Sequence, residues 1–482
     1  MNVESTLVWV SLLPEIGLLV LCALVLGLEV LLRERASRYL GWLTFAGVLV
    51  IALLTLFFAN PGQEGLLVWG GMLRFDQAGY VFRMLFLLGA GVTALFSMDD
   101  PQIGKRGEFY MLLLVSTLGM SLMASAADLV MLYLAIETTS IPLYILSGFI
   151  TRDDKSTEAG LKYMLFGAMT SAILLYAFSL IYGFTGTTQL YLMAEKFSTV
   201  PIPLAGLGLV LLMTVAGLAF KISAVPMHFW APDVYEGAPA PVAGFLSTAS
   251  KAAGFAVLMR VLAVAFPALT GIWSTLLAVL AVATMLVGNL LALPQRNIKR
   301  LLAYSSIAQA GYILIGLATG SVDGANAIMY YLMAYLVTNL AAFGVVEVAS
   351  RSLGSDQLAD YRGLGRRSPG LGVALLLVLL SLGGIPPFAG FFGKFLVFAA
   401  AVQNNLIWLV VIGVLNTVVG LYYYLRLLQL IYEPAEGEVK LSLPGAWKAA
   451  LAICLVGVLV LGVVFVPGYE WATQAATAIW VH

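Results

Sequence analysis

Long apolar segments separated by short polar joins run through this chain from one end to the other. A helix that crosses a membrane needs about 20 mostly apolar residues, and segments of about that length recur along the sequence. Polar joins such as 151–155 and 294–300 divide them. The pattern predicts an all-α polytopic membrane protein with fourteen transmembrane helices, at residues 8–32, 39–58, 80–97, 109–125, 127–149, 162–182, 204–229, 241–266, 273–293, 301–318, 325–349, 371–402, 406–432 and 449–466.

The distribution of basic residues between the predicted loops supports this count. Even-numbered loops and the two termini hold only Arg74 and Lys196, whereas the odd-numbered loops hold sixteen Lys and Arg residues. Basic residues accumulate on the cytoplasmic side of membrane proteins. The sequence therefore predicts a cell (inner) membrane protein with both termini on the outer side. The sixteen residues are Arg33, Arg35, Arg38, Lys105, Arg106, Arg152, Lys155, Arg296, Lys299, Arg300, Arg351, Arg362, Arg366, Arg367, Lys440 and Lys448.

Composition agrees with a membrane protein and argues against several kinds of partner. Of the 482 residues, 61% are hydrophobic and only 10% are charged, against about 25% charged in a soluble domain. The formal net charge is zero, so no nucleic acid or other polyanion is expected. The sequence has no glycine fingerprint for a nucleotide and no cysteine cluster, and we expect no cofactor and no metal on this chain. Cys22 and Cys454 lie in separate apolar segments and are interpreted as small buried residues.

Two of the predicted spans contain helix-breaking residues. Pro226 follows Lys221 in the seventh span, and Pro386 and Pro387 precede Lys394 in the twelfth. Irregular backbone at membrane depth is tolerated only inside protein or beside a water-filled cavity. Interrupted helices at matching places in two halves indicate an inverted-repeat transporter. We therefore expect a single transmembrane domain over 1–482, with five-helix repeats at 109–266 and 273–432 and flanking helices at 1–97 and 449–466.

Charged residues lie within the predicted spans, where each costs at least a few kcal/mol and so rarely persists without a task. Glu137 lies in the middle of the fifth span, and a lysine near it would form a pair poised between neutral and charged states. Lysine loses its proton readily on burial, whereas arginine stays charged. The lysines are thus candidates for a proton path and the arginines for static anchors. The seven basic residues are Arg83, Lys162, Lys221, Lys251, Arg260, Lys394 and Arg426.

Other interpretations of these residues stay open from the sequence. A Glu–Lys pair could be a static contact that sets helix packing, and Lys162 could extend to the interface. His228 fits a proton relay or a structural hydrogen bond equally well. Asp233 and Glu236 fit helix caps better than a proton entrance. Four acidic residues near span ends are expected at the interface: Glu15, Glu29, Asp128 and Glu347.

Three long motifs resemble those of the antiporter-like membrane subunits of respiratory complex I, and most closely the subunit N family, whose mitochondrial counterpart is NADH dehydrogenase subunit 2. The lysine at position 394 resembles the residue found at this motif position in subunit N rather than that in its sibling, subunit M. The motifs are 221–241, which contains Asp-Val-Tyr-Glu-Gly-Ala-Pro, 297–312, and 383–395, which contains Gly-Ile-Pro-Pro-Phe-Ala-Gly-Phe-Phe-Gly-Lys.

The resemblance implies fourteen helices in two inverted five-helix repeats, with helices seven and twelve broken. It also implies a proton-translocating subunit of a NADH:quinone oxidoreductase, with other membrane subunits and the lipid bilayer as partners. NADH, FMN, iron–sulfur clusters and quinone would then be used on other subunits. The family's midplane charges match Glu137, Lys162, Lys221, Lys251 and Lys394 in this sequence. Two alternatives are a subunit of an Mrp-type sodium/proton antiporter and a membrane scaffold with inert buried pairs.

Overall fold

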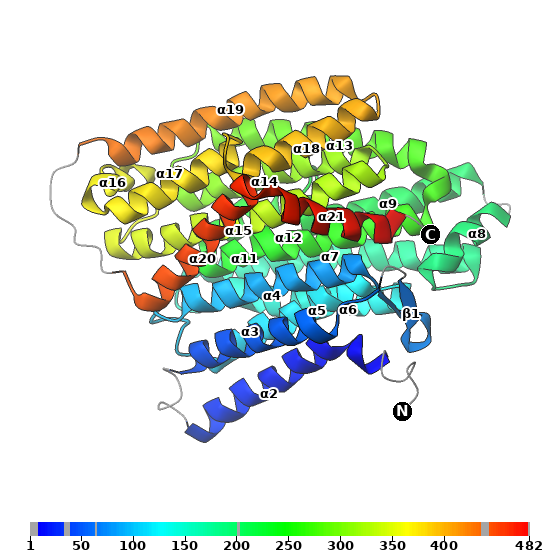
Figure 1. The fold of residues 1–482 in the computed structure, drawn as a ribbon, viewed down its shortest axis with the longest axis horizontal. Helices are drawn as coiled ribbons and strands as arrows, with labels where there is room; N and C mark the ends of the chain where they lie inside the picture. The colour runs from blue at the N-terminus through cyan, green and yellow to red at the C-terminus, as the bar shows by residue number, and fades with distance from the viewer. Residues whose placement is uncertain (1–7, 33–38, 63–64, 200–202, 435–442, 481–482) are drawn as a thin grey trace.

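The fold is seen in a computed structural model, which describes residues 8–32, 39–62, 65–199, 203–434 and 443–480. Four basic residues of the predicted odd loops, Arg33, Arg35, Arg38 and Lys440, lie outside the described residues, as does His482. Helices run side by side along the long axis of the molecule (Figure 1). The architecture is therefore the all-α bundle that the apolar pattern predicts.

Within the described residues, thirteen helices are long and apolar enough to cross a membrane. The eighth span joins α11 (Ala240–Phe245), a π-turn η3 (Leu246–Ser250) and α12 (Lys251–Ala265). The other twelve are α2 (Leu13–Leu32), α3 (Leu40–Phe58), α4 (Gln77–Ser97), α5 (Gly107–Ser125), α6 (Leu129–Ser147), α7 (Asp154–Thr185), α9 (Leu204–Ile222), α13 (Thr270–Ala292), α14 (Ile298–Ala318), α15 (Val322–Leu353), α19 (Ile407–Tyr432) and α20 (Gly445–Val463).

Both predicted breaks are present. The seventh span is α9, which ends at Ile222, and after residues 223–229 the short helix α10 (Trp230–Gly237) lies in the seventh loop. The twelfth span, predicted at 371–402, consists of α17 (Pro369–Gly383) and α18 (Ala389–Gln403). Proline cannot donate a backbone hydrogen bond and clashes with the preceding turn, which explains why both helices stop where the sequence places proline.

The odd-numbered loops lie together at one end of the bundle, which we call the basic end. A continuous series of contacts joins loops from every odd position, as an even alternation of crossings requires. The contacts are Gly107 N to Glu29, Arg106 over the Phe149 ring, Lys155 with Glu236, Glu236 with Arg300, Asn297 bridged to Gln357, and Arg362 with Glu433.

The even-numbered loops and the described ends of the chain meet at the opposite end, which we call the terminus end. Figure 1 shows the start of α2 and the end of α21 (Phe465–Trp480) on this side. The alternation predicted from loop charge is thus confirmed, although contacts do not say which end faces the cytoplasm. The contacts are Trp69 to Val8, Leu73 bridged to Ala126, Asp128 bridged to Gln189, Phe197 against Phe266, Ser274 to Ala318, Asn404 to Ser321, and Trp480 to Gly320.

The last crossing is longer than the predicted span 449–466. Helix α20 ends beside the break in the twelfth span, where Gly462 packs against Pro387 and Phe388 so closely that a Cβ atom would clash. Helix α21 then continues to the terminus end, where the Trp480 indole donates to the Gly320 carbonyl at 3.2 Å. Polar residues such as Glu470 and Gln474 lower the apolarity of α21, which is why the hydrophobic pattern ended too early.

Several short elements have no counterpart in the predicted span series. A two-stranded antiparallel hairpin, β1 (Leu66–Val68) and β2 (Leu73–Phe75), covers the terminus end, with Leu67 opposite Arg74. Its turn needs glycine, because Gly70 and Gly71 have φ values of 68° and 86°. The remaining short elements are η2 (Trp69–Gly71), α8 (Leu190–Thr199), η4 (Pro267–Leu269), η5 (Leu358–Tyr361) and α16 (Leu364–Arg367).

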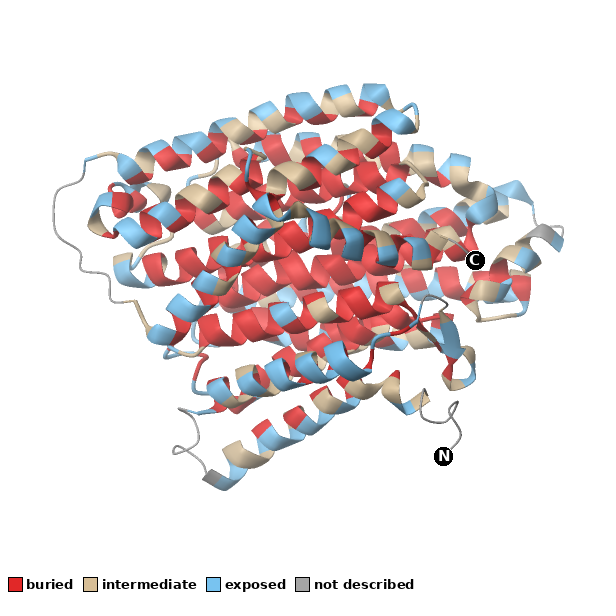
Figure 2. Cartoon of the chain, viewed as in Figure 1, coloured by how far each residue is buried: buried red, intermediate tan, exposed pale blue. Residues whose placement is uncertain are grey.

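The interior is formed by three spans that are covered on all sides. The most apolar stretches of α15 and of the α11–α12 span are entirely buried, and α14 is nearly so. Peripheral helices α2, α3, α7 and α19 bury only about a third of theirs and present apolar side chains outward (Figure 2). An outward apolar belt suits lipid contact, and the central three helices are where buried polar groups can be screened from lipid.

Candidate functional site

The two breaks end their first helices in the same way. Ser223 caps α9 and Gly384 caps α17, both in the left-handed conformation, with φ values of 57° and 82°. In each case the next amide bonds back five residues, from Ala224 to Ala219 O at 2.9 Å and from Ile385 to Leu380 O at 3.0 Å. This cap leaves carbonyl groups at the end of each helix. The breaks therefore create polar backbone deep inside the bundle.

Lys394 uses the carbonyls released at the second break. Its ammonium group donates to Leu382 O at 2.9 Å and to Gly383 O at 3.3 Å, and it lies 4.7 Å from the centre of the Tyr312 ring. The residue is 5% exposed. An interior lysine is thus held by neutral carbonyls and an aromatic face, and its proton has no carboxylate partner in these contacts.

Lys251 is bound in the same neutral manner. Its ammonium group donates to Ser306 Oγ at 2.6 Å and to Ser306 O at 2.8 Å, between α12 and α14. The π-turn η3 ends directly before Lys251. Three residues further, Gly254 lets α9 approach, since a Cβ atom there would lie 3.0 Å from Lys221 Cβ. The glycine at position 254 thus brings two lysine-bearing helices into contact.

Lys221 and Glu137 do not form the direct ion pair that the sequence suggested. The Lys221 ammonium group donates to Ser140 Oγ, and the Glu137 carboxylate accepts from Ser171 Oγ of α7. Ser140 lies three residues after Glu137 on α6, so it is on the same face of that helix. Each charged group is hydrogen-bonded to a serine hydroxyl instead of to the other charged group. One turn of α6 joins Glu137 to Ser140, the partner of Lys221.

Gln309 of α14, three residues after Ser306, lies beside the second break, and it was not among the predicted site residues. Its amide nitrogen donates to Leu382 O at 3.1 Å and to Tyr424 Oη at 3.2 Å, and its oxygen accepts from Tyr331 Oη. Leu382 O is also an acceptor for Lys394. Polar side chains in the apolar span 298–318 were the available signal. We call Glu137, Lys221, Lys251 and Lys394, with their neutral partners, the central row.

A cavity of about 10 Å³ lies beside the central row, enough for about one water molecule. Its polar lining includes Gln309, Tyr331, Tyr335, Thr338 and Ser381. The Tyr335 hydroxyl is buried and has no hydrogen-bond partner among the described residues. A polar cavity at this place joins the surroundings of Gln309 to the break that Lys394 occupies.

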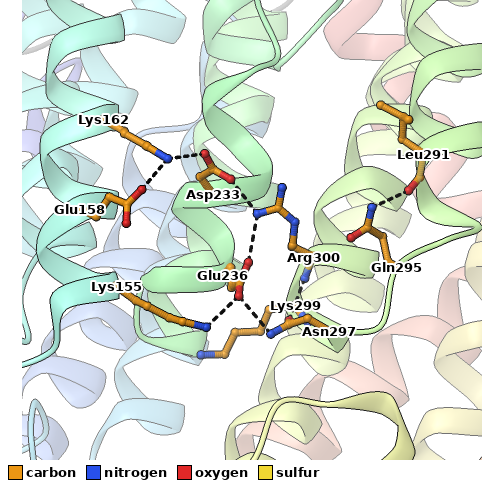
Figure 3. A network of polar contacts seen from close by, with 10 residues as sticks. All are labelled: Lys155, Glu158, Lys162, Asp233, Glu236, Leu291, Gln295, Asn297, Lys299 and Arg300. Atoms are coloured by element: carbon orange, nitrogen blue, oxygen red, sulfur yellow. Dashed lines mark hydrogen bonds and ion pairs between the residues drawn. The ribbon is translucent and has the colours of Figure 1, made fainter.

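Lys162 belongs to a different cluster, near the basic end (Figure 3). Its ammonium group lies 2.6 Å from both Glu158 and Asp233, and its side chain is 36% exposed. Arg300 of α14 pairs with Asp233 at 2.6 Å and with Glu236 at 3.0 Å. We call Lys155, Glu158, Lys162, Asp233, Glu236 and Arg300 the ion network. All of its members except Lys162 line a cavity of about 210 Å³, and the network ties α10 to α7 and α14.

The prediction that Asp233 and Glu236 cap a helix is wrong. Helix α10 has Phe229 at its N-cap and no side-chain capping bond. Both carboxylates instead bind cations from α7 and α14. The sequence could not indicate this, because Lys162 and Arg300 are 71 and 67 residues away from Asp233.

Removing the Asp233 charge should weaken the ion network in a pH-dependent way. Burial raises the pKa of Asp233, but Lys162 and Arg300 outweigh burial and hold it below the ordinary value of 3.8. A depressed pKa means stabilisation that is present above the unfolded value and lost as the pH falls through the folded one. Asp233→Asn should therefore lower the melting temperature of the detergent-purified protein at pH 7, with a difference that shrinks below about pH 4. The matched control is Asp154→Asn, and a difference at pH 3 as large as the difference at pH 7 would contradict the assignment.

Arg83 and Arg260 make buried ion pairs outside the central row. Arg83 pairs with Glu15 at 2.8 Å, and both side chains are less than 5% exposed. The expectation that Glu15 lies at the membrane interface is wrong. Glu15 lies in the first turn of α2, but its side chain is buried inside the protein. Arg260 contacts Asp76 through two nitrogens at 2.7 and 3.0 Å. Paired in this way, the two arginines serve as anchors between helices.

The structure also shows where four further residues with sequence-based expectations lie. Glu347 is 6% exposed rather than interfacial and lies 3.6 Å from Arg351. Arg426, expected as an anchor inside a span, is exposed. His228 is buried in the seventh-span break, 4.4 Å from the Phe229 ring, and its relay role stays a prediction. Asp128 caps α6 through the amides of Val130 and Met131.

Comparison with known proteins places the chain in a family. The family described as NADH:quinone oxidoreductase/Mrp antiporter, TM, matches residues 126–420. The NADH-quinone oxidoreductase subunit N of Moorella thermoacetica is 44% identical over 453 residues, which cover 93% of each protein. A chain of respiratory complex I from Thermus thermophilus with bound aureothin has a TM-score of 0.81 at 35% identity, over 96% of this chain and 99% of that one.

The Mrp complex from Dietzia sp. DQ12-45-1b also contains a chain of this fold. Its TM-score is 0.87 over 100% of this chain and 98% of that one, but the sequences are only 23% identical, so the likeness concerns the fold alone. The identity and coverage of the subunit N relative decide between the subunit N family and the Mrp antiporter. The chain belongs to the NADH-quinone oxidoreductase subunit N family, as its motifs indicated.

Proposed function

We propose that this chain is the proton-translocating membrane subunit N of a multisubunit NADH:quinone oxidoreductase. The observation that carries the proposal is the central row. Among the described residues, the ammonium groups of Lys221, Lys251 and Lys394 are bound by hydroxyls and carbonyls and by no carboxylate. A buried lysine with neutral partners can exist in either protonation state, whereas a carboxylate partner would hold it charged.

The row supplies a route by which protonation could pass between the halves of the bundle. Serine hydroxyls at 140, 171 and 306 both donate and accept, as does a water molecule. Closely spaced titrating groups exchange protons as a coupled set, so a change at Glu137 alters the charge that Lys221 prefers. We propose that Glu137, Lys221, Lys251 and Lys394 change protonation in turn, and that the ion network with Lys162 positions α10 at one end.

The proposal also covers the setting of the chain. We propose that the basic end faces the cytoplasm and both termini lie outside the cell (inner) membrane, and that 109–266 and 273–432 are inverted repeats, each with one broken span. Other membrane subunits of complex I are the proposed partners. NADH, FMN, iron–sulfur clusters and quinone are proposed to act on other subunits. Among the described residues, no group of three or more His, Cys, Asp or Glu could hold a metal ion.

Replacing Glu137 by glutamine tests the proposal. The amide keeps the size of the side chain and accepts the Ser171 hydrogen bond, but it cannot release a proton. We expect the complex to assemble and both proton pumping and quinone reduction to fall several-fold in proteoliposomes. Thr138→Val, on the next position of α6, is the matched control and should pump normally. Normal pumping by an assembled Glu137→Gln complex would reduce Glu137 to a structural role.

The same vesicles separate this function from that of a sodium/proton antiporter. A pump driven by quinone reduction acidifies the vesicle interior when NADH is added, with or without sodium. An antiporter would move protons in response to a sodium gradient in the absence of NADH. Proton movement that requires sodium would overturn the proposal in favour of the antiporter.

A further inference from the structure

One cavity lies at the basic end, away from the central row. Its volume is about 750 Å³, and it lies between the α13–α14 loop, η5 and the last turns of α19. Its lining combines cations with apolar side chains. Arg296, Arg362 and Arg426 provide the positive charge, and Leu301, Leu427 and Leu430 provide part of the apolar wall.

Within the described residues, two of the three guanidinium groups have no acidic partner. Arg362 pairs with Glu433 at 3.3 Å, and the other acidic residue of the lining, Asp360, accepts from Ser355 at 2.5 Å. Arg296 and Arg426 form no ion pair within the part of the chain that the structure describes, and both residues are exposed. The pocket therefore offers two free positive charges to a ligand.

The depth of Arg426 is unusual for a free charge. It lies six residues before the end of α19 at Tyr432, which is about 9 Å along the helix axis. Leu425 and Leu427 flank it in a helix that is apolar enough to span a membrane. A charge at this depth is tolerated when it reaches the phosphates of the lipid headgroups. At this position the guanidinium group lies close both to the level of the lipid headgroups and to apolar side chains.

We infer that this pocket binds one anionic glycerophospholipid, with the headgroup phosphate between Arg296 and Arg426. A guanidinium group matches a phosphate in a two-bond geometry that an ammonium group cannot form. The leucine wall then contacts the glycerol and the upper acyl chains. Basic pockets between membrane helices recognise such lipids by this combination of charge and apolar contact. The inference stands independently of the ion that the central row carries.

Lipid titration of the purified, detergent-washed complex tests the inference. Bound lipid is counted by native mass spectrometry as phosphatidylglycerol or phosphatidylcholine is added. We expect R296Q/R426Q to bind phosphatidylglycerol at one site about 30-fold more weakly than the wild type, since each basic residue near the surface contributes about fivefold. Phosphatidylcholine binding should not change. The matched control, R152Q, removes an exposed arginine of the basic end and should behave as the wild type.

A soluble competitor distinguishes a lipid site from an anion site. Glycerol 3-phosphate carries the headgroup charge without acyl chains and should not displace the lipid. Displacement at equal concentration, or equal lipid binding by R296Q/R426Q, would overturn the inference. If that variant does not assemble, the wild-type complex with a photoactivatable residue at Leu430 gives the answer. It should crosslink to phosphatidylglycerol, and crosslinking only to another protein subunit would show that the pocket is a protein interface.

Discussion

Arginine at position 221 or 394 is expected to leave an assembled complex that has lost about 10²-fold in coupled proton pumping, the scale of a missing proton-transfer group. Arginine carries the same charge but does not release its proton in proteins. If Lys221 and Lys394 each give up a proton during turnover, an arginine at either position keeps that position of the central row protonated and stops the transfer. Their neutral partners, Ser140 and the Leu382 carbonyl, can accept from either side chain.

Lys162→Arg is the matched control for these variants. Lys162 is half-buried, and it is paired with Glu158 and Asp233, so a permanent charge should serve there as well as a lysine. Pumping is measured in proteoliposomes beside quinone reduction, and assembly is checked on the same preparation. Wild-type pumping with arginine at both 221 and 394 would reject proton release and leave a fixed electrostatic role for the row.

Arg260→Met is expected to destabilise the protein by about 3–5 kcal/mol, the cost of leaving a buried charge unpaired. Both partners in the Arg260–Asp76 pair are almost fully buried, at 2% and 0% side-chain exposure. Arg260 also donates to the Ala124 carbonyl and to Tyr191. Loss of the guanidinium would leave the buried Asp76 carboxylate with only its longer ion pair to Arg74, at 3.6 Å, and would loosen the packing below the hairpin. The amount of assembled complex and its melting temperature measure the effect.

A second substitution separates the charge from the packing. Asp76→Asn removes the stranded charge yet keeps an oxygen to accept from Gly79, which Asp76 caps. The double variant Arg260→Met/Asp76→Asn should therefore be more stable than Arg260→Met alone. Equal instability of the single and double variants would show that Arg260 acts through packing rather than through its charge.

The number of the crossings and their alternation between two ends of the bundle could be predicted from the sequence. A helix that crosses a bilayer needs about 20 apolar residues, and basic residues accumulate in the loops on one side of the membrane. Both the apolar segments and the basic loops can be recognised from short stretches of the sequence. Proline at 226 and 386–387 likewise marks the two breaks through its own backbone chemistry. The last predicted span corresponds to α20 (Gly445–Val463), and α21, which follows it, is too polar to be recognised as part of a crossing.

The partners of the charged residues could not be predicted. Glu137 and Lys221 were expected to pair, but serines on α6 and α7 separate them. Gln309 was not singled out, although it joins the carbonyl of Leu382 to Tyr424. These contacts join residues more than 30 positions apart, and no local pattern encodes which faces of two helices meet.

By itself, the sequence determined which residues this protein places in the membrane: fourteen crossings, two breaks and a set of charges too costly to be accidental. Only the tertiary structure decided what those charges touch. It put Lys162 in the ion network and left Arg426 at a pocket, while Lys221, Lys251 and Lys394 received neutral partners. The physical reason is that the bilayer acts on each segment separately, whereas a buried ammonium group must find its hydrogen bonds on whichever helices pack around it.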